Sequence, residues 1–338
     1  MIKQAMAISV KPILLPANDY LADLTERIQD CTQRIAIVTT IFHNDSERME
    51  LFVQALCAAA ERGVDVSLCV DSFTYLEPNG PWRHLLKDQS AQAYRAIRTE
   101  RRLKSAGVKF RWLGKGANFG VMGRTHMKWC IADNTVYSFG GVNLYEMGIA
   151  NTDYMFRIVS ADLADAMLER HNQLISADRA NHAGKNRTIT ISSRTRILFD
   201  GGIPFHSHIY DRAIEHAKQS KHIVFVSQYC PTGKLARVLR SKNAKLYFNH
   251  WEAASALNTL VIKTGMRSSK FETLYELEPY LHAKFIIYTL DDGSKVALTG
   301  SHNFQSGGVI LGTRELCLET TSPHIIAELE RYFKTHVR

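Results

Sequence analysis

Two stretches of the chain carry the same combination of reactive side chains. Each has a His-x-Lys triplet and, further along, a Gly-x-x-Asn turn. The residues are His126, Lys128, Gly140, Gly141 and Asn143 in the first stretch, and His282, Lys284, Gly300, Ser301 and Asn303 in the second. A His and a Lys two residues apart in an extended strand project from the same face. Together the two copies would form an anion-binding pocket that holds a titratable nucleophile and a titratable acid.

These side chains supply what the cleavage of a phosphodiester needs. One imidazole can attack phosphorus while the other protonates the leaving alcohol. Lys128 and Lys284 would hold the phosphate by charge, and Asn143 and Asn303 would donate hydrogen bonds to it. This chemistry requires neither a metal ion nor another cofactor, and we expect none.

The elements that precede the first copy follow a strand, helix, strand order. Residues 34–41 and 64–70 are apolar runs, and between them the apolar spacing predicts a helix that Asp45 or Ser46 caps and Gly63 ends. This order is typical of a βαβ unit in a parallel or mixed sheet. A basic helix over residues 95–104, a strand over 108–112 and a glycine-rich loop over 114–123 then lead to His126.

The second half of the chain repeats this order after a polar linker at residues 177–187. We expect a strand over 188–198, a helix over 207–218, a strand over 223–227, a motif strand that begins at Leu281 and a closing helix over 324–333. The repeat predicts an α/β protein of two pseudo-symmetric halves, residues 1–180 and 188–338, each with a mixed central sheet between helices. One active site would lie at their interface.

Composition limits the possible binding partners and the cellular compartment of the protein. The 338 residues carry a formal charge of +9 with a pI near 9.2, which favours an anionic membrane surface or nucleic acid as the partner. The six cysteines are scattered and lie mostly in apolar runs, so they are expected to be reduced, buried thiols. No leader pattern and no apolar run long enough for a bilayer is present. We expect a cytoplasmic protein that at most lies on the inner face of a membrane, with no obligate protein partner.

The repeated motif resembles the signature of the phospholipase D superfamily. That signature is His-x-Lys, four residues, Asp, and then a Gly-Gly or Gly-Ser turn with Asn. The first copy matches in full and includes Asp133, whereas the second has Thr289 where the Asp belongs. Asp291, two positions later, is the nearest substitute. The resemblance implies that the two copies build one site, with His126 as the nucleophile by family habit and His282 as the acid.

The family also has an acidic residue downstream of each Gly-x-x-Asn turn, matched here by Asp153 and Glu315. By this resemblance each carboxylate would orient one catalytic histidine, and the sequence leaves open which carboxylate serves which histidine. Gly141 and Ser301 would contact the phosphate. Phrases outside the motif, such as Ala59-Ala60-x-Arg62-Gly63-Val64 and Ala106-Gly107-Val108-x-Phe110, are similar to bacterial cardiolipin synthases.

The resemblance implies an enzyme that cleaves or transfers phosphodiesters of anionic phospholipid through a phosphohistidine, as a phosphatidyltransferase or a phospholipase D. Two alternatives stay open. A nuclease of the same superfamily would use the basic helix, Arg95 to Lys104, to follow a phosphate backbone. A phosphoanion-binding module without catalysis is suggested only by Thr289.

Overall fold

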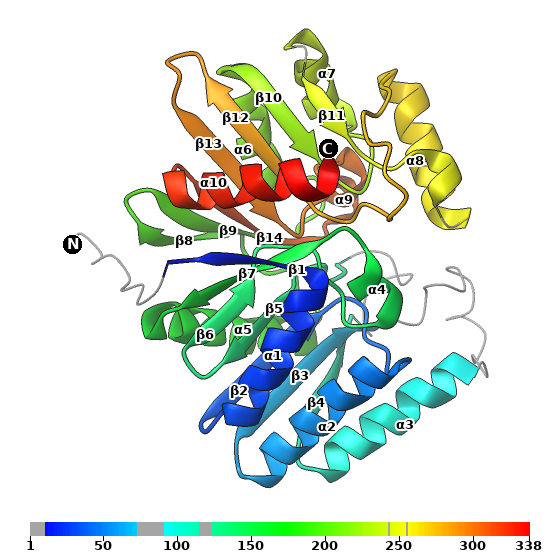
Figure 1. Ribbon diagram of the computed structural model, residues 1–338, viewed down its shortest axis with the longest axis vertical. Coiled ribbons are helices and arrows are strands. Elements are labelled where there is room, and N and C mark those ends of the chain that lie inside the picture. Colours follow the sequence, from blue (N-terminus) through cyan, green and yellow to red (C-terminus); the bar gives the residue numbers. More distant parts are fainter. Residues whose placement is uncertain (1–10, 73–90, 115–122, 243, 255) are drawn as a thin grey trace.

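The computed structural model describes residues 11–72, 91–114, 123–242, 244–254 and 256–338. It is a mixed α/β protein in two halves, each built on a seven-stranded mixed sheet, as predicted (Figure 1). The first sheet has the order β1-β7-β6-β5-β2-β3-β4, and the second has the order β11-β10-β12-β13-β14-β9-β8. Most of the glycine-rich loop, residues 115–122, lies outside the described part.

The strands of the first sheet are β1 (Ile13–Pro16), β2 (Arg34–Thr39), β3 (Asp65–Asp71), β4 (Lys109–Leu113), β5 (Trp129–Ala132), β6 (Thr135–Ser138) and β7 (Tyr154–Val159). Those of the second are β8 (Arg187–Ser192), β9 (Thr195–Gly201), β10 (Ser220–Val226), β11 (Lys245–Tyr247), β12 (Phe285–Leu290), β13 (Lys295–Gly300) and β14 (Arg314–Thr320). The helices are α1 (Ala17–Asp30), α2 (Glu47–Glu61), α3 (Ala91–Ser105), α4 (Glu146–Ala150), α5 (Ala161–Arg179), α6 (His208–Lys218), α7 (Gly233–Ser241), α8 (Ala256–Ser269), α9 (Ser306–Leu311) and α10 (Pro323–Tyr332).

The two sheets are pseudo-symmetric. Strand β5, which follows the first motif, is flanked by β2 and β6, and β12, which follows the second motif, is flanked in the same way by β10 and β13. In both sheets the pairing around the motif strand is antiparallel, and the next pair outward, β2 with β3 or β10 with β11, is parallel. Strands β4 and β8 are additions at opposite edges. The internal repeat read from the motifs is therefore a repeat of topology.

The two sheets separate three hydrophobic cores. Helices α1, α2 and α3 pack on one face of the first sheet, and α6 and α7 pack on one face of the second. The facing sides of both sheets share a third core with α5 and α10, where Trp129, Phe156 and Phe285 are fully buried. Because this core draws on both halves, their relative position is fixed by burial of apolar surface. Among the described residues, no helix is long and apolar enough to cross a membrane.

Several boundaries differ from the sequence prediction. The predicted strand over 188–198 is a hairpin of β8 and β9, because the chain turns at Ser193 and Arg194. The motif strands begin after the motifs, at Trp129 and Phe285, so the His-x-Lys triplets are extended segments before the strands. Helices α4 and α9, which directly follow the two Gly-x-x-Asn turns, were not predicted. The Ser46 cap of α2 is present, since its side chain accepts a hydrogen bond from the Met49 amide.

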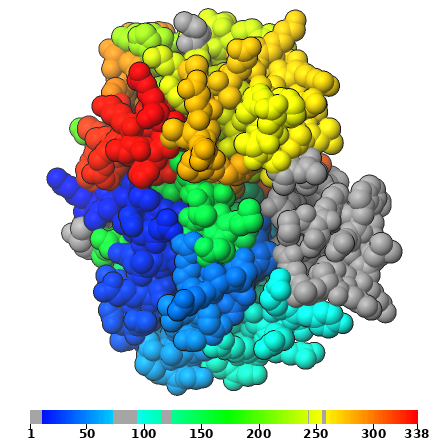
Figure 2. Space-filling model, turned by 45° about the vertical axis from the view of Figure 1, so that its right-hand side comes forward, coloured from blue at the N-terminus to red at the C-terminus, as the bar shows by residue number. Residues whose placement is uncertain are grey.

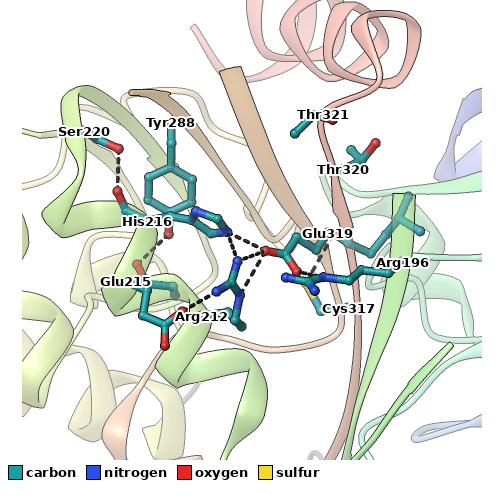
Figure 3. A network of polar contacts seen from close by, with 12 residues as sticks. Arg196, Arg212, Glu215, His216, Ser220, Tyr288, Cys317, Glu319, Thr320 and Thr321 are labelled. Atoms are coloured by element: carbon teal, nitrogen blue, oxygen red, sulfur yellow. Dashed lines mark hydrogen bonds and ion pairs between the residues drawn. The ribbon is translucent and has the colours of Figure 1, made fainter. Parts of the chain in front are cut away.

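Away from the motifs, a charged network joins α6 to the second sheet (Figure 3). The buried Glu319 carboxylate on β14 accepts hydrogen bonds from Arg212 and contacts the His216 ring and Arg196. Burial would raise the pKa of Glu319, but these partners hold it well below its usual range. His216 therefore has a structural role in joining α6 to β14.

Candidate active site

The structure pairs each motif histidine with the carboxylate of the other half. Nδ1 of His126 lies 3.1 Å from Glu315 Oε2, and Nδ1 of His282 lies 2.6 Å from Asp153 Oδ2. Both carboxylates have pKa values below their usual range, so they are ionised acceptors and each Nδ1 carries the proton. Nε2 of each ring is therefore the atom left with a lone pair for chemistry.

The backbone explains this exchange between the halves. Thr125, just before His126, forms a parallel bridge with Arg314, just before Glu315. Thr152, just before Asp153, forms the equivalent bridge with Leu281, just before His282. The His126 amide donates to the Arg314 carbonyl at 2.9 Å, and the His282 amide donates to the Thr152 carbonyl at 3.0 Å. Each histidine is thus placed by main-chain bonds to the half that supplies its carboxylate.

The two lysines are buried within the same site. Lys128 Nζ donates to Thr40 Oγ1 and to the His126 carbonyl, both at 2.8 Å, and Lys284 Nζ donates to the His282 carbonyl. Burial, and for Lys128 the charge of Lys284, lower the pKa values to about 7 for Lys128 and about 8 for Lys284. Two confined ammonium groups that repel each other make a site that an anion would stabilise.

The same surroundings keep the histidines neutral. Burial lowers the pKa of His282 to about 3, helped by Lys284 and opposed by Asp153. Burial also lowers the pKa of His126, opposed by Glu315. The Glu315 carboxylate, despite its burial, has a pKa of about 2 because His126, His302 and Ser301 stabilise its charge. At neutral pH the site holds neutral imidazoles and ionised carboxylates.

The Gly-x-x-Asn turns have a packing reason for their first glycine. A Cβ on Gly140 would lie 1.7 Å from the Tyr154 carbonyl oxygen, and one on Gly300 would lie 2.2 Å from that of Leu316. The second position differs between the halves. The Gly141 amide donates to Asp153 Oδ1 at 3.2 Å, whereas the Ser301 hydroxyl donates to Glu315 Oε2.

A Cβ on Gly141 would also lie 2.9 Å from Lys284 Nζ, which locates this turn beside the lysine of the other half. Asn143 is buried, and its Oδ1 accepts from the Ile41 amide at 3.3 Å. Asn303 Oδ1 is buried and has no hydrogen-bond partner among the described residues, so this oxygen is an unused acceptor. The structure brings both turns to the histidines and lysines.

The structure does not bring Asp133 to the site, contrary to the role expected for it. Asp133 follows β5 at the end opposite Lys128, and its carboxylate accepts hydrogen bonds from the amides of Thr32, Gln33 and Arg34 at 2.9–3.0 Å. Burial opposes ionisation, but these amides lower its pKa. It holds the start of β2, so its task is structural.

The second half has a different arrangement at the position that corresponds to Asp133. Thr289 lies within β12, paired with Lys295 and His222. The Asp291 amide donates to the Gln219 carbonyl at 2.9 Å, which matches the bond from the Asp133 amide to the Arg34 carbonyl. Asp291 is exposed at the hairpin tip and thus replaces Asp133 by its backbone. The missing carboxylate leaves His282 unaffected, because Asp153 orients that ring.

Two further side chains adjoin the His126 pair and were missed in the sequence. His302, inside the second Gly-x-x-Asn turn, is buried, accepts from the Phe304 amide at 2.7 Å, and has its pKa lowered to about 4 by burial. Asp200 is the cross-strand partner of Glu315, and burial raises its pKa to about 7. His302 could have been found from its position in the turn, whereas nothing in the sequence indicates the register that brings in Asp200.

The His, Cys, Asp and Glu side chains of the described residues form no metal centre. No group of three or more His, Cys, Asp or Glu side chains there is arranged to hold an ion. All six cysteines are buried thiols, and burial raises the pKa of several, including Cys69 and Cys230, to about 12.

Comparisons with solved structures agree with the fold. The chain resembles the crystal structure of phosphatidylserine synthase from Haemophilus influenzae with a TM-score of 0.73 and 16% identity, over 99% of this chain and 88% of that one. It resembles polyphosphate kinase from Porphyromonas gingivalis with a TM-score of 0.61 and 12% identity, over 97% of this chain and 50% of that one. At these identities the likeness shows the fold. A comparison with curated protein sequences gave no match.

The family assignment comes from the sequence itself. The family model described as "Cardiolipin synthase, PLD-like domain" matches residues 24–175 and 210–337, which is most of the chain and includes both His-x-Lys motifs. This match and the paired histidines lead to one conclusion: the chain belongs to the cardiolipin synthase, phospholipase D-like domain family, within the phospholipase D superfamily.

Proposed function

We propose that this protein is a phosphatidyltransferase, similar to cardiolipin synthases, that acts on anionic phospholipid through a phosphohistidine. The observation that carries the proposal is the exchanged pairing of two histidines with two carboxylates around two buried lysines. Such an arrangement supplies a nucleophile, an acid and fixed positive charge in one site. Membership of the family supports an enzyme of the phosphodiesterase or transferase type.

In the proposed reaction His126 Nε2 attacks phosphorus, and the bond from phosphorus to the leaving alcohol breaks. His282 gives a proton to that alcohol oxygen, then removes a proton from the acceptor hydroxyl, which attacks the phosphohistidine and releases His126. A lipid alcohol as acceptor gives phosphatidyl transfer, and water gives phospholipase D activity. The His126 side chain is 19% exposed and that of His282 is 8% exposed, which favours His126 as the group that meets the substrate first.

The low pKa of His282 is compatible with the role of acid once substrate is bound. Burial is the main cause of this low pKa, and Lys284 and Lys128 lower it further. A phosphodiester anion between the lysines neutralises part of their charge, so the pKa of His282 rises and protonation becomes accessible. Substrate binding would in this way prepare the acid.

An apolar rim beside the site supports a lipid substrate. Met147 on α4 is 71% exposed and Ile310 on α9 is 48% exposed, and these helices directly follow Asn143 and Asn303. Figure 2 shows α4 in green beside the gold segment that follows α8, which carries the exposed Leu274 and Leu277. Exposed apolar side chains around an anion site suit a phospholipid at a membrane surface.

A nuclease activity is the second candidate, because α3 presents exposed basic side chains. Arg102 and Lys104 are paired with Glu50 and Glu100, while Arg98 and Arg101 have no ion pair among the described residues. A basic helix of this kind could follow a phosphate backbone. Incubation without metal ions, with phosphatidylglycerol vesicles or with single- and double-stranded DNA and RNA, separates the candidates. New cardiolipin without nucleic-acid cleavage supports the transferase, and the reverse result contradicts it.

The roles of the histidines are tested with leaving groups of different acidity. The p-nitrophenolate group of a p-nitrophenyl phosphodiester leaves without needing a proton. His282→Ala should therefore release a single stoichiometric burst of nitrophenolate and retain the phosphohistidine. His126→Ala should give no burst, and both variants should fail on an alkyl diester. A burst from His126→Ala and none from His282→Ala would reverse the assignment.

The rim is tested separately from the chemistry. Met147→Asp and Ile310→Asp should weaken binding to anionic vesicles and slow lipid turnover, while turnover of a soluble diester stays unchanged. Leu51→Asp is the matched control, because Leu51 is 53% exposed on α2, a helix that carries no residue of either motif. If the control loses as much vesicle binding as the rim variants, the rim has no special role.

A further inference from the structure

A cavity lies on the first sheet, apart from the histidines. Its volume is about 400 Å³, within the range of small-molecule sites. Its floor comes from the first residues of β2, β3 and β4, and its wall comes from α5. Helix α5 packs mainly over β2, β5 and β6. The catalytic Lys128 instead contacts Thr40, beyond the other end of β2.

The charges around this cavity are predominantly positive. Four basic side chains line it, and Asp65 is the one carboxylate in the lining. These basic residues are Arg34, Lys109, Arg111 and Arg179. Two of them are already engaged, since Arg34 pairs with Asp165 at 2.5 Å and Lys109 with Asp65 at 2.7 Å.

The other two guanidinium groups are available. Arg111, half-buried on β4, and Arg179, exposed at the end of α5, have no ion pair or hydrogen bond among the described residues. Guanidinium groups bind phosphate through two parallel hydrogen bonds and do not lose their charge at physiological pH. Two unpaired arginines from different elements around one cavity favour an oxyanion with several acceptor oxygens.

The remaining lining is neutral. His171 on α5 is buried, with its Nε2 at 2.8 Å from the Ser67 hydroxyl, and burial lowers its pKa to about 4, so it adds no charge at neutral pH. Its Nδ1 has no hydrogen-bond partner in the described part of the chain. Leu168 and Ile175, on the same helix, give the wall an aliphatic stripe. A ligand that fills the space would join an anionic head to an apolar group.

We infer that this cavity binds a small phosphate monoester that carries an apolar group, at a site separate from the catalytic histidines. The phosphate lies between Arg111 and Arg179, and the apolar group lies against Leu168 and Ile175. The inference does not depend on the reaction proposed above, because none of these residues belongs to the motif site.

Calorimetric titration with butyl phosphate tests this site. The motif lysines also attract phosphate, so the wild-type protein should show two sites, one of which is lost in Lys284→Met. The Arg111→Gln, Arg179→Gln double variant should lose the other, with affinity at least about tenfold weaker. Arg237→Gln is the matched control, since it removes an equal charge from an exposed position on α7, and it should titrate like wild type.

Two results would overturn the inference. One is a double variant that binds butyl phosphate as the wild-type protein does. The other is inorganic phosphate bound at this site as tightly as butyl phosphate, which would remove the role of the aliphatic wall. The single variant Arg179→Gln excludes a folding defect as the cause of weaker binding. Because Arg179 is exposed at a helix end, this variant should weaken binding of butyl phosphate without a change in thermal stability.

Discussion

The two motif histidines have the same partners by type but different surroundings. His282 lies deeper, 8% exposed, and its bond to Asp153 is 2.6 Å, whereas His126 is 19% exposed and lies 3.1 Å from Glu315. Ser301, His302 and Asp200 adjoin Glu315 in the His126–Glu315 pair. The two histidines thus have unequal surroundings, as the unequal roles proposed for them require.

At this scale we predict that Asp153→Asn lowers kcat about 10- to 100-fold, because the amide cannot stabilise a protonated His282. The protein should remain folded, since the asparagine retains the size of the side chain. Steady-state kinetics on an alkyl diester measure the loss, and circular dichroism checks the fold. Unchanged kcat would show that Asp153 does not serve His282.

A second residue-scale prediction concerns the cost of confined charge. The pKa of Lys284 falls from 10.5 to about 8 on burial, so the folded protein is penalised for this ammonium group at neutral pH. Lys284→Met should raise the free energy of unfolding by about 1–3 kcal/mol and abolish turnover. Urea unfolding at pH 7 measures the gain. A less stable variant would mean that the hydrogen bond to the His282 carbonyl outweighs the repulsion.

At the scale of elements, the strands after the motifs are held at their far ends by different means. The Asp133 carboxylate accepts hydrogen bonds from three amides at the start of β2. In the second half the corresponding bond is the main-chain one from the Asp291 amide to the Gln219 carbonyl. This explains how the second motif can carry Thr289 and still form a complete site. The aspartate of the signature secures a strand.

We therefore predict that Asp133→Ala destabilises the protein by about 1–2 kcal/mol, as the loss of a helix cap does, because three amides lose their acceptor. Turnover per folded molecule should be unchanged. Thermal unfolding and kinetics at a temperature well below the transition measure the two quantities. Lost turnover with unchanged stability would instead make Asp133 a catalytic residue, as the motif alone suggested. Asp292→Ala, at the exposed tip of the other hairpin, is the control.

At the scale of the whole molecule, the halves are interlocked through the site itself. Each supplies the carboxylate for the other's histidine, and the bridges beside these pairs join residues about 130 to 190 positions apart in the chain. The same interface holds the shared hydrophobic core. Ionisation at the site should consequently govern how the halves stay together.

This interlocking predicts acid sensitivity. The pKa of His282 is lowered to about 3 in the folded protein, so between pH 6.5 and about 3 the unfolded chain binds more protons at this residue and stability falls as pH falls. Glu315, with a pKa lowered to about 2, loses its contribution from about pH 4.5 downward, in the same direction. Thermal unfolding from pH 7 to 4 should show a falling transition temperature, with a shallower fall in His282→Asn. Equal slopes would contradict the assignment of this titration.

The sequence by itself predicted the reactive groups and determined the general architecture. A His-x-Lys, Gly-x-x-Asn pattern that occurs twice identifies the reactive groups, and apolar periodicity identifies a strand, helix, strand order, because both depend on residues close in the chain. Only the tertiary structure decided that Glu315 serves His126, that Asp153 serves His282, and that Asp133 serves a strand. These outcomes depend on register between segments far apart in sequence, which local pattern does not encode.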